Sequence, residues 1–176
     1  MALRKAAAYS KRKARPYTRK SNKKSKSYIK TVPPQKIVKI EMGDLKGRAA
    51  GKYPIELKLI SMERVQIRDN ALEASRQYIN KMLDKGLNKE YYFAIRVYPH
   101  HILRENKALT GAGADRMSSG MQRSFGKVIG RAAQVKANQE VFLVAVKDEK
   151  SVPLSRSALQ KIKPKLPCKC KVIVER

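Results

Sequence analysis

The sequence predicts an α+β fold, in which one mixed sheet carries two helices packed on one of its faces. Several short β-rich segments alternate with only two segments of helical periodicity, and this order is typical of layered α+β domains. A chain of 176 residues is long enough for a single core with an attached tail. The third observation is a net charge of +27, which places many cations outside that core.

The first half of the core domain begins with β-rich stretches. Partial or clean alternation of apolar residues predicts strands, and glycines predict a loop between the first two of them. The predicted strands are KIVKIE at residues 36–41, IELKLI at 55–60 and a segment around Val65 and Ile67, with a loop at 43–53.

A helix is predicted from Asn70 to Lys85, with Asp69 as its N-cap and Gly86 as the residue that stops it. Apolar residues recur there at spacings of three and four, so one stripe should lie on the sheet. The stripe consists of Leu72, Ile79 and Leu83.

The second half opens with the strongest strand pattern, YYFAIRVYP at residues 91–99, which is rich in aromatic and β-branched residues. Residues 132–135 and 140–146 are predicted to form a β-hairpin across a polar turn at 136–139. A second helix is predicted to run to about Lys163, with Ser155 as its cap and Pro164 as its end, and a last strand is predicted at 168–174.

A basic tail, residues 1–31, is predicted to precede a single α+β domain, residues 32–176. Residues 1–30 hold twelve Lys and Arg and no acid, so the segment cannot bury enough apolar surface to offset its ordering entropy. We expect it to be disordered alone in water and to order against RNA, with its tyrosines stacking on bases.

The charge excess favours a polyanion as partner, and nucleic acid is the leading candidate. An anionic membrane is the weaker alternative, because no segment approaches the ~20 apolar residues that a span requires. The basic N-terminus is not followed by the apolar run of a signal peptide, so we expect a cytoplasmic protein. Cys168 and Cys170 are then expected to be reduced thiols beside the last strand.

A long internal loop, residues 104–131, contains many of the residues that indicate RNA binding. Glycines let its backbone approach phosphates closely, and its spaced cations offer donors to them. Together with the tail and two adjacent histidines, it supplies the predicted RNA-binding residues. These are Arg12, Arg15, Arg19, Lys20, His100, His101, Arg104, Lys107, Arg116, Arg123, Lys127 and Arg131.

The spacing of the glycines in this loop does not match that of known nucleotide-binding enzymes. Gly120 and Gly126 are one residue too far apart for a P-loop, and Val128 replaces the hydroxyl that such a loop uses to bind magnesium. His100 and His101 have no recognisable nucleophile beside them. The C-x-C pair lacks the two further ligands of a zinc site. We therefore expect no enzyme activity, no cofactor and no metal.

Three segments resemble one family closely: IRVYPHHILRENK, TGAGADRMSSGM and SFGKVIGRAA. They are similar to the central signature of the universal large-subunit ribosomal protein family called L-sixteen in bacteria and L-ten-e in archaea and eukaryotes. QIRDNALEASRQYINKML, PPQKIVKIEMGDL and KIKPKLPCKCKVIV extend the resemblance over roughly residues 17–174. No long polar extension follows the last strand, which favours an archaeal member.

The resemblance implies a fold of the hammerhead type and a structural role in the large ribosomal subunit, without chemistry of its own. It implies partners in large-subunit rRNA, neighbouring ribosomal proteins and the acceptor end of aminoacyl-tRNA, near the peptidyl-transferase centre, and no self-oligomer. The alternative is a general basic protein that binds or compacts nucleic acid. The loop residues that the resemblance places near tRNA are Lys107, Thr110, Gly111, Gly113, Asp115 and Arg116.

Overall fold

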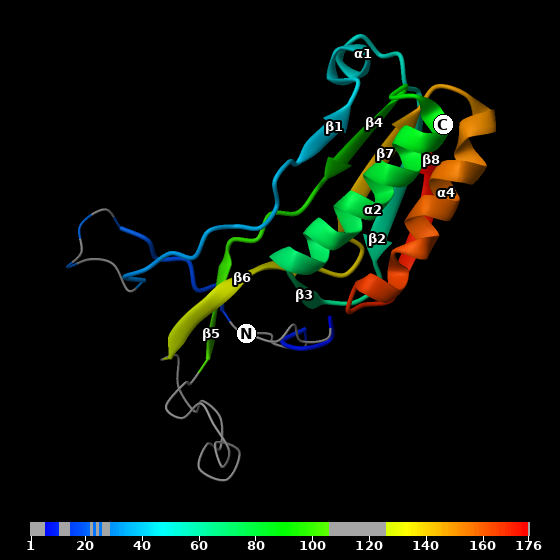
Figure 1. Ribbon diagram of the computed structural model, residues 1–176. Coiled ribbons are helices and arrows are strands. Elements are labelled where there is room, and N and C mark those ends of the chain that lie inside the picture. Colours follow the sequence, from blue (N-terminus) through cyan, green and yellow to red (C-terminus); the bar gives the residue numbers. More distant parts are fainter. Residues whose placement is uncertain are drawn as a thin grey trace.

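Two antiparallel sheets and a pair of helices make up the fold (Figure 1). A computed structural model describes residues 6–10, 15–21, 23, 25, 29–105 and 126–175. The larger sheet has the strand order β1-β4-β7-β2-β8, and the smaller sheet has the order β3-β6-β5. The strands are β1 (Glu41–Gly43), β2 (Ile55–Ser61), β3 (Val65–Arg68), β4 (Tyr91–Ile95), β5 (His101–Glu105), β6 (Lys127–Val135), β7 (Glu140–Val146) and β8 (Cys170–Glu175).

The helices lie mainly on one face of the larger sheet, where α2 and α4 run side by side (Figure 1). The described helices are α1 (Leu45–Ala49), α2 (Asp69–Leu87) and α4 (Val152–Lys161), with 3-10 turns η2 (Glu149–Ser151) and η3 (Lys163–Lys165). The α+β class is confirmed, as is the packing of two helices on one face. The prediction of one mixed sheet is wrong, because the strands divide between two sheets and every recorded pairing is antiparallel.

The core lies between the larger sheet and α2 and α4. β4 is buried along its whole length, and the alternating side chains Ile55, Leu57 and Leu59 of β2 point into the same cluster. Each such apolar side chain contributes roughly 1.5–3 kcal/mol when it leaves water. The predicted stripe of α2 is confirmed, because all three of its residues are fully buried.

Helix α2 differs from its prediction at both ends. Asp69 is the first helical residue and Arg68 precedes it as the N-cap, while the helix continues through Gly86 and ends before Asn88, which has a φ of 44°. A Cβ at Gly86 would lie 2.7 Å from Leu154 Cδ2 of α4. Gly86 therefore allows two helices to approach closely, and the interpretation of this glycine as a helix stop is wrong.

The stretch predicted as a first strand, residues 36–41, becomes regular only at β1. Before it, the backbone N–H groups of Lys36 and Val38 donate to Asp69 Oδ2 at 3.2 Å and Glu73 Oε2 at 3.3 Å. These carboxylates lie four residues apart on one face of α2. They satisfy alternate N–H groups of the extended chain, which attaches this segment to the helix.

Replacing Glu73 with Gln is expected to destabilise the protein by about 1–2 kcal/mol at neutral pH, since several charge-assisted hydrogen bonds weaken. The Arg76 guanidinium donates to both carboxylate oxygens of Glu73, at 2.6 and 2.8 Å, and lowers its pKa. A carboxyl group whose pKa is lowered by folding contributes stability above its unfolded-state pKa, and this contribution is lost as pH falls through the folded-state pKa. Urea unfolding across this acid range should show the difference between wild type and variant shrinking, whereas Glu90→Gln, at an exposed position, should change little throughout.

The predicted hairpin of residues 132–135 and 140–146 is wrong. β6 pairs with β3 and β5 in the smaller sheet, whereas β7 pairs with β2 and β4 in the larger one. The turn between them is held by the end of β2: Asn138 N–H donates to Ser61 O at 2.7 Å, and Ser61 N–H donates to Gln139 O at 3.0 Å. The turn thus carries the chain from one sheet to the other.

The second predicted helix is present but begins earlier. It starts at Val152 with Pro153 in its first turn, and Ser155 is a buried residue inside it instead of a cap. A proline is well tolerated there because the first N–H groups of a helix need no carbonyl partner. Pro164 falls in η3, after the helix has ended. None of the helices within the described ranges combines the length and apolarity needed to cross a membrane.

Candidate nucleic-acid interface

The smaller sheet projects from the core and carries the beginning and the end of the predicted internal loop (Figure 1). β5 extends as far as Glu105 and β6 begins at Lys127, so both ends of the stretch 104–131 are strand and not loop. The two strands pair from His101–Ala132 to Glu105–Lys127, with an irregularity at Leu103 and Arg104. The strand at β5 was missed because HILRE follows a proline and histidines and offers only a short apolar pattern.

The tail packs on this smaller sheet through Tyr17. Its backbone N–H donates to His101 Nδ1 at 2.9 Å, and its carbonyl accepts from the Ile102 N–H at 3.1 Å. The guanidinium carbon of Arg104 lies 3.6 Å from the centroid of the Tyr17 ring, a cation–π contact. The described part of the tail is therefore attached to β5 by backbone and side-chain contacts.

The tail also contacts the smaller sheet through residues 6–10, the described segment nearest the N-terminus. The Tyr9 hydroxyl donates to Glu105 Oε1 at 2.8 Å, and the Gln66 N–H of β3 donates to Ser10 O at 3.1 Å. Because these contacts join residues far apart in the sequence, composition alone could not reveal them. The described tail thus contacts the smaller sheet at Tyr9, Ser10 and Tyr17, while its disorder without RNA stays a prediction.

His101 and Arg104, both predicted to bind RNA, share Tyr17 as a protein partner. His101 and Arg104 are only 3% and 5% exposed, and both contact Tyr17. Their geometry makes them positioning residues for the tail. A direct contact of either side chain with RNA stays a prediction.

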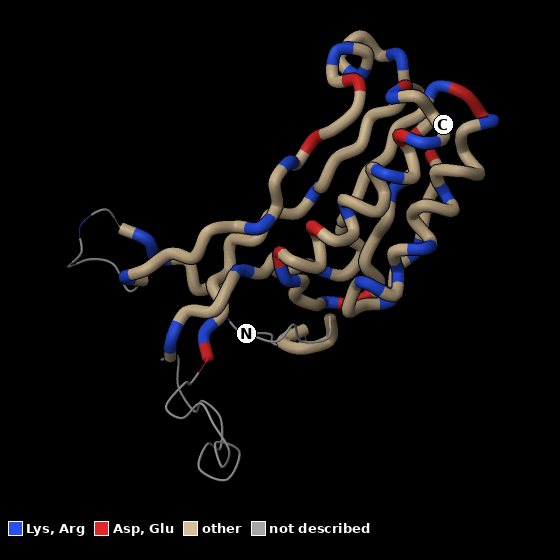
Figure 2. The backbone as a smooth tube through the Cα atoms, in the orientation of Figure 1, with Lys and Arg blue, Asp and Glu red and all other residues tan. Residues whose placement is uncertain are grey.

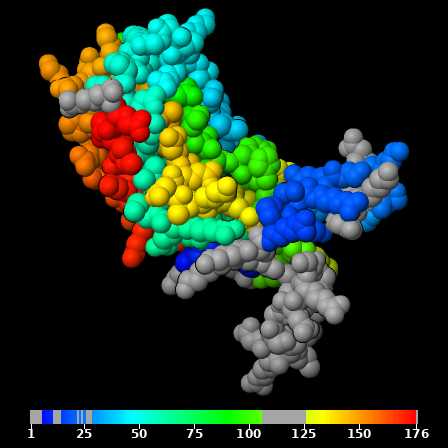
Figure 3. Space-filling model, turned by 180° about the vertical axis from the view of Figure 1, so that it is seen from behind, coloured from blue at the N-terminus to red at the C-terminus, as the bar shows by residue number. Residues whose placement is uncertain are grey.

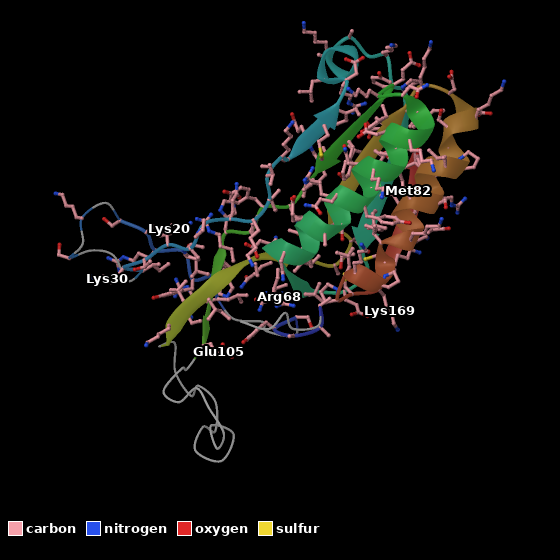
Figure 4. All side chains as sticks on the ribbon, in the orientation of Figure 1. Lys20, Lys30, Arg68, Met82, Glu105 and Lys169 are labelled. Carbon is pink, nitrogen blue, oxygen red and sulfur yellow. The ribbon has the colours of Figure 1, made fainter. Side chains whose placement is uncertain are left out.

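Four other predicted residues are exposed cations that come from the tail and from β6. We call Arg15, Arg19, Lys20 and Lys127 the cationic cluster. Figure 2 shows basic residues along the tail and at the free end of β6, and Figure 4 labels Lys20 on the tail. These four exposed positions place positive charge at the surface, where a polyanion can approach it.

Arg131 of β6 is hydrogen-bonded to the chain just after the tail, and its charge acts on Lys20 of the cationic cluster. Its Nε donates to the Pro33 carbonyl at 2.7 Å. Partial burial lowers the pKa of Lys20, and the nearby charge of Arg131 lowers it further. Like charges brought together in this way repel one another, and a bound phosphate between them would relieve the repulsion.

Of the remaining predicted site residues, His100 lies within the described part of the chain. His100 is exposed, and its ring centroid lies 4.5 Å from that of Tyr98. The others lie outside the described residues: Arg12, Lys107, Thr110, Gly111, Gly113, Asp115, Arg116 and Arg123.

Charges on the larger sheet are balanced, unlike those of the cationic cluster. Lys58 lies within 4 Å of Glu56, Glu140 and Glu175. Arg48 pairs with Glu56, and Arg96 Nε lies 3.5 Å from Glu140 Oε2. Figure 3 views the molecule from the side away from the helices, with β8 in red. The balanced network offers little net attraction to a polyanion, so the smaller sheet and tail are the better candidate interface.

The described residues were also compared with the requirements of a metal site. No three side chains of His, Cys, Asp or Glu gather there as a metal would require. Cys168 and Cys170 are both free thiols.

Replacing Tyr17 with Ala is expected to release the tail from β5 while the larger sheet stays intact. Arg104 would lose its ring partner, and the backbone contacts of Tyr17 would become easier to break. Hydrogen exchange should show faster exchange at Ile102 and unchanged exchange in β4 and β7. Tyr17→Phe keeps the ring and should behave like wild type; equal loss of protection in both variants would contradict a role for the ring.

These features define a class of protein: a small α+β domain whose ion pairs balance on one sheet while exposed cations gather on a second sheet and a basic tail. Comparison with known families is more specific. The family model of ribosomal protein L16p/L10e matches residues 13–173, and the chain belongs to this family. Proteins of this family are structural components and not enzymes.

Curated relatives are similar to this chain over most or all of its length. The chain is 44% identical over 177 residues to the large ribosomal subunit protein uL16 of Methanococcus maripaludis strain C7, with 100% of this chain and 96% of the relative covered. It is 45% identical to uL16 of Methanosphaerula palustris, covering 86% and 85%. It is 44% identical to uL16 of Thermofilum pendens, covering 92% and 90%. The resemblance stated from the sequence motifs is confirmed, and its archaeal character is supported.

Proposed function

We propose that this protein is a structural constituent of the large ribosomal subunit in the cytoplasm, and that its tail and smaller sheet bind large-subunit rRNA. The observation that carries the rRNA proposal is the cationic cluster, which is exposed on the tail and β6, whereas the charges of the larger sheet are paired. Membership of the L16p/L10e family supports the ribosomal role. Backbone anchoring of the tail at Tyr17 supports binding as a surface of defined shape.

We further infer that the segment between β5 and β6 serves the site where aminoacyl-tRNA is accommodated. The paired strands β5 and β6 give this segment two fixed attachment points. Its residues Lys107, Thr110, Gly111, Gly113, Asp115 and Arg116 match the family signature that the resemblance places near the tRNA acceptor end. The same resemblance supports a fold of the hammerhead type and contacts with neighbouring ribosomal proteins.

Sedimentation tests the ribosomal role. A tagged copy of the full chain, expressed in an archaeal host, is expected to migrate with large subunits at high magnesium and to stay there through a moderate salt wash. Migration with free soluble protein would contradict the proposal.

A binding titration separates rRNA recognition from general affinity for nucleic acid. Affinity for a large-subunit rRNA fragment and for duplex DNA of equal length should both fall steeply with salt, because released counterions drive both. The ratio of the two affinities is the informative quantity. A ratio that favours rRNA at every salt concentration supports shape-dependent binding, whereas a ratio near one would favour a general nucleic-acid-binding or compacting protein.

A further inference from the structure

Two cysteines lie in contact where the chain enters β8, the edge strand of the larger sheet. The Sγ atoms of Cys168 and Cys170 are 3.4 Å apart, and both residues are half-buried. β8 pairs with β2, so that Cys170 stands opposite Ser61. Figure 4 labels Lys169, the residue between the cysteines, well away from Lys20 and Lys30 of the tail. The proposed RNA interface makes no use of this pair.

The two thiols are chemically unequal although they are neighbours. A hydrogen bond from Cys170 lowers the pKa of Cys168, and the Ser61 hydroxyl lowers it further. The same bond raises the pKa of Cys170, and burial raises it further. Burial opposes the lowering at Cys168, but the two opposite shifts still make Cys168 the more acidic thiol of the pair. A nucleophilic thiolate next to a second thiol is the arrangement that resolves a mixed disulfide.

Distance also favours a bond between the two sulfurs. A disulfide has an S–S length of about 2.05 Å, so the sulfurs need to approach by little more than ~1 Å. Cys168 lies just before β8 and Cys170 is its first residue, at the edge of the larger sheet. Between them, Lys169 O accepts the Met62 N–H at 2.9 Å, so we expect the sulfurs to approach mainly by rotation of the two side chains. A ring closed between residues i and i+2 is small and strained, which makes such a disulfide easy to reduce.

We propose that Cys168 and Cys170 form a reversible dithiol–disulfide modification site, whose oxidant is a low-molecular-weight disulfide. The Cys168 thiolate attacks one sulfur of the oxidant, whose S–S bond breaks and releases one thiolate that takes a proton from water. Cys170 then loses its proton to solvent and attacks Cys168 Sγ, expelling the second small thiolate, which is also protonated. The protein dithiol is oxidised by two electrons, and one small disulfide becomes two small thiols.

The test uses the full-length protein in buffers with graded ratios of oxidised to reduced glutathione. As the ratio rises, we expect both free thiols to disappear together, with a mass loss of about 2 Da and no covalent dimer, and excess reduced glutathione should restore them. Stable glutathione adducts on wild type, or disulfide-linked dimers as the main product, would overturn the proposal. So would two thiols that persist at every ratio.

Single variants assign the order of attack. Cys170→Ser is expected to stop at a glutathione adduct on Cys168, because the resolving thiol is missing. Cys168→Ser should form its adduct several-fold more slowly at neutral pH, since the remaining thiol is less ionised. Equal rates for the two variants would overturn the assigned order.

A pair of substitutions at residue 170 tests whether geometry controls the reactivity of Cys168. Serine keeps a hydroxyl donor and alanine removes it. Alkylation of Cys168 at neutral pH should therefore be several-fold slower in Cys170→Ala than in Cys170→Ser, and this difference should vanish in concentrated urea. Identical rates in the folded variants would overturn the role given to the contact between the two residues.

Discussion

Replacing the four residues of the cationic cluster with Gln should weaken binding to a large-subunit rRNA fragment by roughly a hundredfold at low salt. Each cation that neutralises a phosphate releases condensed counterions, and this release supplies much of the affinity. Four lost contacts should also lower the slope of log affinity against log salt by about 3. Filter binding or fluorescence anisotropy at several salt concentrations measures both quantities.

A matched variant controls for the change in net charge. Lys81 and Lys85 on α2, together with Lys150 and Lys161 beside and at the end of α4, are also exposed. Their replacement with Gln removes the same total charge from the helical side of the molecule. If the location of the cationic cluster matters, this control should lose much less affinity and keep its salt slope. Equal losses in the two quadruple variants would indicate that total charge alone governs binding.

Replacing Gly43 with Ala is expected to destabilise the protein by about 2–4 kcal/mol. Gly43 ends β1 with a φ of +87°, and a Cβ there would lie 2.1 Å from the Tyr91 carbonyl oxygen. That oxygen accepts the Asp44 N–H at 2.8 Å, so it cannot move aside without breaking a backbone hydrogen bond. The variant therefore suffers both left-handed strain and a steric clash with the main chain.

Gly51→Ala separates the two causes. Gly51 has a φ of +74°, but a Cβ there meets nothing within 4 Å. Only the conformational strain remains, which costs about 1 kcal/mol. Urea unfolding of the two variants should place Gly43→Ala well below Gly51→Ala in free energy of unfolding. Similar values for both would show that β1 shifts freely away from β4.

Elements with local, periodic signals could be predicted from the sequence. The apolar stripe of α2, the alternation in β2 and the aromatic run of β4 each follow from burial on one or both faces. The charge excess and the quoted motifs were also sufficient to place the chain in its family. Periodicity and motifs depend on residues that are near one another in the chain, and charge depends on composition, so all three can be recognised before the structure is known.

The way in which these elements combine depends on long-range packing. Residues 132–146 were predicted to form one hairpin. In the structure, β6 pairs with β3 in the smaller sheet and β7 pairs with β4 in the larger sheet. Gly86 was interpreted as a helix end, but it lies inside α2, where a Cβ would come within 2.7 Å of Leu154 Cδ2 of α4. The cause in both cases is packing between segments far apart in sequence, which local propensity does not encode.

The candidate interface divides in the same way. Sequence identified the cations of the tail and of β6, because charge is a property of composition. Only the structure brought Tyr17 onto Arg104 and His101, and only the structure placed Cys168 against Cys170. Side-chain partners are selected by the folded backbone, and their distances are fixed only when sheets and helices have packed.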